Sequence, residues 1–181
     1  MTINNFTVKN LEKTFGAIIT DIKLSDITSK QAEDLYKVWL DRSLLIFPDQ
    51  HLTNDEQVKF AKNFGELEFD LSPISNVRTD GTIRDATEDD IVKSLRGNME
   101  WHHDSTYMPL QAKGAVLTAH VVPSKDGQTG WADMSAAYES LSPSMQEKIQ
   151  GLQAFHSYEW SQKERYGHKS KEESAFNSYG F

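Results

Sequence analysis

Residues 101–104 read Trp-His-His-Asp, and this stretch is the most informative part of the sequence. It places His102 two positions before the carboxylate of Asp104. In an extended segment, side chains two positions apart lie on one face, so both could reach one metal ion. A histidine and a carboxylate make up two of the three ligands in the 2-His-1-carboxylate triad that holds non-haem iron(II). The spacing alone is weak evidence, because such a pair is more often simply hydrogen-bonded.

Composition and charge limit the classes of protein that the chain could be. Its 181 residues, 38% hydrophobic and 25% charged, suit one globular domain. A net charge of -8 argues against a nucleic-acid-binding surface. The sequence has neither a run of apolar residues that would span a bilayer nor the start of a signal peptide, so we expect a cytoplasmic protein with no membrane partner. Without cysteine, a metal site must use His, Asp, Glu or carbonyl oxygen.

Helices and strands are predicted in an irregular order. Two capping boxes, Thr28 with Gln31 and Thr53 with Glu56, each predict the start of a helix. Two further helices are expected over residues 135–141 and 143–151, and strands over residues 15–24, 43–47, 115–122, 129–132 and 152–160. Between residues 70 and 98 the pattern fades, which predicts a long active-site loop or lid. Residues 161–181 form a poorly patterned tail. The mixture favours an α+β domain over a doubly wound sheet.

Further motifs accompany the histidine–aspartate pair in a fixed order. Downstream are Pro109 and residues 114–117, 122–123, 127–131 and 136–138; upstream are residues 16–17, 21–22, 45–47, 49–50, 60–61 and 64–67. Together with residues 98–107, NMEWHHDSTY, these motifs closely resemble the TauD/TfdA family, the iron(II)- and 2-oxoglutarate-dependent dioxygenases of taurine and 2,4-dichlorophenoxyacetate. Residues 74–77 before Asp80-Gly81 are more similar to the phenoxyacetate branch. The resemblance covers residues 15–156.

This resemblance implies a fold and a set of site residues. The fold is a double-stranded β-helix, or jelly-roll, core with flanking helices. His102 and Asp104 match the family's first two iron ligands, and Thr129 matches the threonine that binds a carboxylate of 2-oxoglutarate. Asn98 falls where the taurine branch has an asparagine in contact with substrate. The open positions on iron(II) would take 2-oxoglutarate and O2, while the protein supplies position and excludes water.

The chain departs from the family pattern in its C-terminal half. The family's third ligand is a downstream histidine, followed by an arginine that binds 2-oxoglutarate. None of the later histidines matches: we expect His120 to be a core histidine of a buried strand, His156 aligns with a non-ligand, and His168 lies in the tail. Arg165 lies outside the carboxylate-binding motif. We therefore expect the N-terminal portion of a longer enzyme, or a natural truncation, with an incomplete jelly roll.

The resemblance implies an oxidoreductase that hydroxylates a small organic acid, such as a sulfonate or an aryloxyalkanoate, and releases succinate and CO2. It also allows a homo-oligomer. Two alternatives stay open on the residues alone. The chain could be a non-catalytic remnant of the family, or a jelly-roll metal protein with hydrolytic chemistry.

Overall fold

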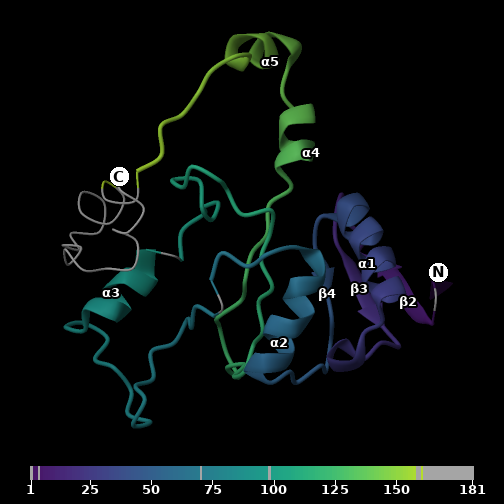
Figure 1. Ribbon diagram of the computed structural model, residues 1–181. Helices are drawn as coiled ribbons and strands as arrows, with labels where there is room; N and C mark the ends of the chain where they lie inside the picture. The colour runs from purple at the N-terminus through teal and green to yellow at the C-terminus, as the bar shows by residue number, and fades with distance from the viewer. Residues whose placement is uncertain (1, 4, 70, 98, 158–159, 161–181) are drawn as a thin grey trace. The chain divides into compact units, whose positions relative to one another are not determined.

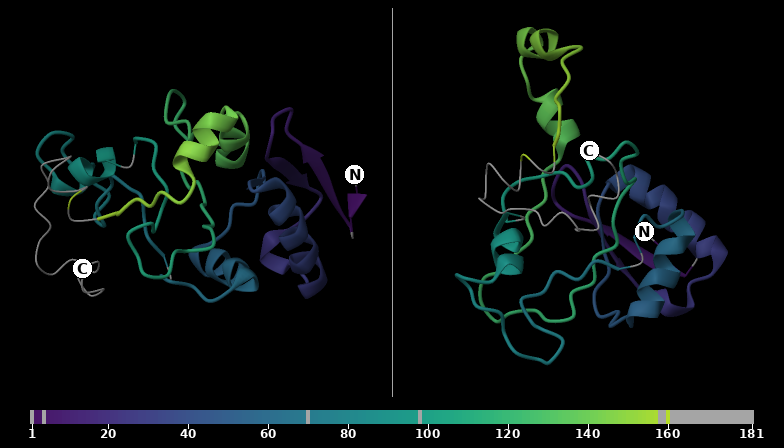
Figure 2. Two further views of the ribbon diagram at one scale, coloured as in Figure 1. Left: turned by 90° about the horizontal axis from the view of Figure 1, so that it is seen from above. Right: turned by 60° about the vertical axis from the view of Figure 1, so that its left-hand side comes forward.

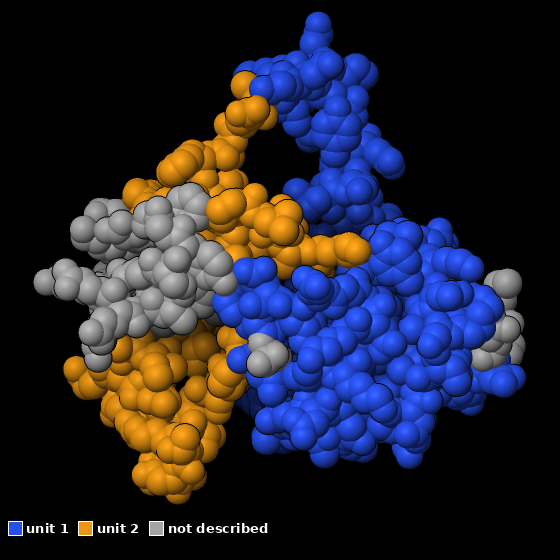
Figure 3. Space-filling model, in the orientation of Figure 1, with its two compact units in different colours: residues 1–71, 115–151 blue, residues 72–114, 152–181 orange. Residues whose placement is uncertain are grey.

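The computed structural model describes residues 2–3, 5–69, 71–97, 99–157 and 160, and shows a mixture of helices and sheet (Figure 1). The predicted tail, residues 161–181, lies outside the described residues. The chain divides into two compact units, residues 1–71 with 115–151 and residues 72–114 with 152–181 (Figure 3). The described helices include none that is long and apolar enough to cross a membrane. The single domain expected from the sequence stays a prediction.

The first unit contains a four-stranded sheet in the order β1-β2-β3-β4. The strands are β1 (Thr2–Ile3), β2 (Phe6–Asn10), β3 (Ala17–Thr20) and β4 (Leu45–Ile46). Antiparallel pairing aligns Val8 of β2 with Ile19 of β3, and β4 runs parallel to β3. The predicted strand over residues 15–24 is shorter than expected, because Asp21 has a φ of 60° and turns the chain into a 3-10 helix at Leu24–Asp26.

Both capping boxes form, and they begin the two helices that were predicted from them. α1 (Ser29–Arg42) starts after Thr28, whose hydroxyl accepts a hydrogen bond from the backbone N–H of Gln31. α2 (Asn54–Ala61) starts in the same way after Thr53, with Glu56 as the reciprocal partner. A 3-10 turn, Lys62–Phe64, follows α2 and ends at Gly65. Each box satisfies backbone donors that the first helical turn otherwise leaves open.

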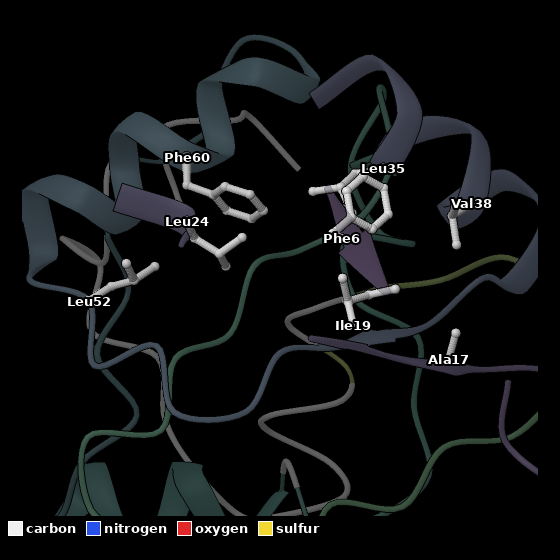
Figure 4. Packing of buried hydrophobic residues seen from close by; sticks show 8 residues of the cluster. All are labelled: Phe6, Ala17, Ile19, Leu24, Leu35, Val38, Leu52 and Phe60. Atoms are coloured by element: carbon white, nitrogen blue, oxygen red, sulfur yellow. The ribbon is translucent and has the colours of Figure 1, made fainter. Parts of the chain in front are cut away.

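The hydrophobic core lies between these helices and the sheet. Leu35 and Val38 of α1 point toward Phe6, Ala17 and Ile19 of the sheet (Figure 4). Phe60 of α2 extends the cluster toward Leu24 and Leu52 (Figure 4). α1 lies beside β2 and β3 in Figures 1 and 2. Because apolar positions of α1 recur every three or four residues, one face of the helix supplies all of its core contacts.

The second unit contains a helix that the sequence interpretation placed in a loop. α3 (Asp90–Gly97) lies within residues 70–98, so the expectation of an irregular segment there was wrong in part. Two signals for the helix were present. Ile91, Val92 and Leu95 recur at helical spacing, and Asp89 immediately before them accepts a hydrogen bond from the backbone N–H of Ile91 at 3.0 Å.

The other four predicted strands also fail or shrink. Residues 115–122, 129–132 and 152–157 form no strand, and in the described chain no segment pairs with them. Val121, Val122 and Phe155 are exposed, and so is His120, which is therefore not the core histidine that was expected. The run at 43–47 forms only the two-residue strand β4, half-exposed and not buried. A strand is stabilised by hydrogen bonds to neighbouring strands, so an apolar run alone does not make one.

The two C-terminal helices do form as expected. α4 (Met134–Glu139) starts after Asp133, and α5 (Pro143–Ile149) has proline at its first position. A hydrogen bond from the backbone N–H of Ala136 holds the pKa of Asp133 below its usual range, because it stabilises the ionised carboxylate. Neither helix buries any of its described side chains.

Two leucines of α1 provide a test of this core. Leu35 is fully buried, whereas Leu40 on the same helix is 66% exposed. We expect Leu35→Ala to lower the free energy of unfolding by about 2–5 kcal/mol, because it removes buried methyl groups and leaves a cavity. Leu40→Ala should change it by less than about 0.5 kcal/mol. Urea unfolding followed by circular dichroism measures both, and equal effects would contradict this packing.

Candidate metal centre

The predicted ligand pair lies in the second unit, on the chain that follows α3. Residues 102 and 103 have no regular structure and residues 104–107 form a turn, with Ser105 at a φ of 61°. The segment is therefore not a strand, yet its turn brings the two side chains together. Nε2 of His102 lies 3.2 Å from Oδ1 of Asp104. Both side chains are accessible, at 46% and 75% exposure.

A backbone contact determines which nitrogen of His102 is free. Nδ1 of His102 lies 2.7 Å from the carbonyl oxygen of Glu100. Because a carbonyl can only accept, Nδ1 carries the hydrogen and donates it. In the neutral ring Nε2 then presents its lone pair toward the Asp104 carboxylate. Two acceptors at 3.2 Å repel each other unless a proton or a metal cation lies between them.

The spacing of the two acceptors suits one metal ion. Protein nitrogen and oxygen ligands lie about 2.1 Å from a divalent transition metal. Two such ligands at a right angle on one ion are roughly 3 Å apart, as adjacent positions of a facial triad require. The separation of Nε2 and Oδ1 is 3.2 Å. An orienting carbonyl on the other ring nitrogen is also the common arrangement for a metal-binding histidine. The residues present therefore fit a metal.

His103 faces a different set of neighbours. Its Nδ1 lies 2.9 Å from the carbonyl oxygen of Asp104 and 2.8 Å from the side-chain amide of Gln111. It is exposed, in line with the sequence interpretation that kept it out of the ligand pair. The contacts of Glu100 and Gln111 were not anticipated. A backbone carbonyl has no sequence signal, and Gln111 is nine residues from His102 with nothing in its neighbourhood to mark it.

The other two predicted site residues are Thr129 and Asn98. Thr129 belongs to the first unit and is exposed. Asn98 lies outside the described residues. Among residues 2–3, 5–69, 71–97, 99–157 and 160, no third His, Asp or Glu completes a metal-binding group. The described part of the chain thus brings together two of the three ligand types that a facial triad needs, one histidine and one carboxylate.

Known proteins that are similar to the chain include curated dioxygenases. A protein of Sphingobium herbicidovorans named (S)-phenoxypropionate/alpha-ketoglutarate-dioxygenase is 50% identical over 177 residues, 97% of this chain and 61% of its own length. An alpha-ketoglutarate-dependent 2,4-dichlorophenoxyacetate dioxygenase of Cupriavidus pinatubonensis is 33% identical, over 81% of this chain and 56% of its own length. The chain thus spans about three fifths of the length of these relatives.

A solved structure is similar to most of the chain. It is the crystal structure of AAD-2 in complex with Mn(II) and N-oxalylglycine, with a TM-score of 0.84 and 29% sequence identity. The likeness covers 92% of this chain and 62% of that one. It confirms the predicted fold class, α+β with an incomplete jelly-roll core.

A family model gives the assignment. The model described as taurine catabolism dioxygenase TauD, TfdA family matches residues 7–179. This range includes the motifs at 98–107 and 127–131 from which the resemblance was inferred. The chain belongs to the TauD/TfdA family of dioxygenases.

Proposed function

We propose that the protein is an iron(II)- and 2-oxoglutarate-dependent dioxygenase that hydroxylates a small organic acid and forms succinate and CO2. The observation that carries the proposal is the pair of acceptors, Nε2 of His102 and Oδ1 of Asp104, held 3.2 Å apart. The hydrogen bond from His102 to the Glu100 carbonyl turns the free lone pair toward the carboxylate.

His102 and Asp104 would hold the iron, and a histidine beyond the described cluster would complete the triad. When bound, the metal supplies the activation of O2 that the side chains themselves cannot provide. The hydroxyl of Thr129 would donate a hydrogen bond to a carboxylate of 2-oxoglutarate, and Asn98 would contact the substrate. These assignments rest on the family motif together with the geometry of the pair.

The substrate class follows from the relatives. The 50% identical relative is named for (S)-phenoxypropionate, and the 33% identical one for 2,4-dichlorophenoxyacetate. Both names describe an aryl ether of a short carboxylic acid. We therefore place an aryloxyalkanoate first among candidate substrates and a sulfonate second. We further propose a cytoplasmic enzyme without nucleic-acid or membrane partners, and a homo-oligomer as its assembly.

A non-catalytic remnant would keep the fold but not the metal. The spacing of Nε2 of His102 and Oδ1 of Asp104, which suits two ligands of one metal ion, supports the enzyme over this alternative. A hydrolytic metal protein would be recognised by a preference for zinc and by the absence of 2-oxoglutarate turnover.

Metal binding tests the pair directly. We expect His102→Ala to weaken Mn(II) binding by at least roughly tenfold, because it removes one of the two proposed ligands, the imidazole nitrogen. Titration of Mn(II), followed by the electron paramagnetic resonance signal of the free ion, measures the dissociation constant without any turnover. His120→Ala is the matched control, since His120 is also exposed but belongs to the other unit. Equal binding by the two variants would refute the assignment of His102.

Turnover tests the reaction class and Thr129. The protein expressed from its complete reading frame should release succinate from 2-oxoglutarate when given iron(II), ascorbate and a phenoxypropionate. Thr129→Ala should raise the KM for 2-oxoglutarate by roughly tenfold, the worth of a hydrogen bond to a charged group, and Thr129→Ser should restore it. Absence of succinate with every aryloxyalkanoate and sulfonate offered would rule out the proposed function.

A further inference from the structure

A short hairpin precedes α3 in the second unit. Val77 and Ile83 form an antiparallel bridge, and the backbone N–H of Arg84 donates to the carbonyl of Asn76 at 2.8 Å. The turn at Asp80-Gly81 closes the hairpin, with Gly81 at a φ of 84°. Oδ1 of Asp80 accepts hydrogen bonds from the backbone N–H and the hydroxyl of Thr82, at 2.9 and 2.7 Å. The hairpin is thus stabilised from within.

The link from the hairpin to α3 is also ordered by carboxylates. Oδ1 of Asp85 accepts from the backbone N–H groups of Thr87 and Glu88, at 2.7 and 2.8 Å. These bonds lower the pKa of Asp85 to about 2. Oδ1 of Asp89 accepts from the first turn of α3 at Ile91. A carboxylate therefore stabilises each turn between the hairpin and α3.

Asp89 joins the two elements through its second oxygen. Its Oδ2 lies 3.0 Å from Nη2 of Arg78 and 3.3 Å from Nη1 of Arg84, the two arginines of the hairpin. The Asp89 side chain is 12% exposed, so its carboxylate is largely withdrawn from water, whereas the Arg78 side chain is 39% exposed. Burial raises the pKa of Asp89, but the bonds from Ile91 and Arg84 outweigh it and leave the pKa below its usual range. The carboxylate is ionised at neutral pH and holds both arginines.

The arginines do not make this cluster an anion-binding site. Residues 76–93 carry three basic side chains, Arg78, Arg84 and Lys93. They also carry five acidic side chains, at positions 80, 85, 88, 89 and 90. The local charge is negative, so an incoming anion would be repelled. The geometry is that of a charge-assisted clamp between a hairpin and a helix start. Arg78 is its stronger arm, because Nη1 also donates to the Ile83 carbonyl at 3.2 Å while Nε of Arg84 is buried without a partner in the described chain.

The clamped body precedes the ligand pair in the chain, and residue 98 between them lies outside the described residues. α3 ends at Gly97, the backbone N–H of Met99 donates to Arg96 at 3.1 Å, and His102 donates to Glu100 at 2.7 Å. We propose that Asp89 is a positioning residue for the His102–Asp104 pair. It makes residues 76–97 one rigid body, and this body determines where the chain carrying the two ligands begins. The inference rests on the proposed function for the role of the pair, but the rigid body itself does not.

The test is whether a substitution in the hairpin changes hydrogen exchange in α3, and the reverse. Arg78→Gln lies in the hairpin, and we expect it to speed hydrogen exchange at the backbone N–H of Lys93 in α3 by roughly tenfold. Asp89→Asn, at the start of α3, should speed exchange at the hairpin N–H of Arg84 by a similar factor. Asp90→Asn is the matched control. It makes the same change in charge one residue later, at a carboxylate whose nearest cation is Lys93 at 3.8 Å and which touches neither arginine.

The position of the ligand pair is read without any metal. The Cε1–H resonance of His102 should shift by more than its line width in Asp89→Asn and stay in place in Asp90→Asn. Effects confined to the element that carries the substitution, or an unmoved His102 resonance in Asp89→Asn, would overturn the proposal. If His102→Ala leaves Mn(II) binding unchanged while exchange and the resonance respond as expected, the proposed function fails and the positioning of His102 by Asp89 stands.

Discussion

The described fold depends on the packing of one face of α1 against β2 and β3. Leu35 meets Phe6 and Ile19 there, and all three side chains are fully buried. Apolar burial of this kind is the main favourable term in folding, and the same core receives the ends of α2 and the 3-10 turns. Gln57 of α2 also contacts the later segment of the same unit, residues 115–151, because its side-chain amide donates to the Val116 carbonyl at 2.9 Å. Segments that do not reach this core, among them α4 and α5, keep most of their apolar side chains exposed.

The candidate metal centre is built on a different principle. It has little burial and no strand to hold it, and its geometry comes from a turn at Asp104 and one backbone hydrogen bond to His102. An exposed contact between a histidine and a carboxylate contributes little to stability, so the arrangement is not explained by folding energy. The proposed metal site would explain it, since Nε2 of His102 and Oδ1 of Asp104 are directed at one point and match two of the three donors of a facial triad. The clamp at Asp89 gives the same chain a rigid approach from the N-terminal side.

Short sequence motifs predicted most of the helices, whose backbone hydrogen bonds form within one segment. The capping boxes at Thr28 and Thr53 and the proline at position 143 predicted helices that formed where expected. The apolar run at residues 115–122 looked equally clear and formed no strand. The difference is physical: a helix satisfies its own backbone within one segment, whereas a strand needs neighbours that the run itself cannot specify. α3 was missed because its acidic start looked like a loop, although Asp89 caps it.

By itself, the sequence determined the family, the α+β class and the identity of His102 and Asp104 as a pair, because these depend on residue types and their order. Tertiary structure decided which atoms face each other. It placed Nδ1 of His102 against the Glu100 carbonyl and left Nε2 facing Asp104, a contact for which the sequence carries no signal. It also joined Arg78, Arg84 and Asp89 across 11 positions of the chain. Such contacts arise when the backbone bends back on itself. The turn at Asp80-Gly81 brings residues together that are separated in the sequence, and their spacing in the sequence does not predict the contact.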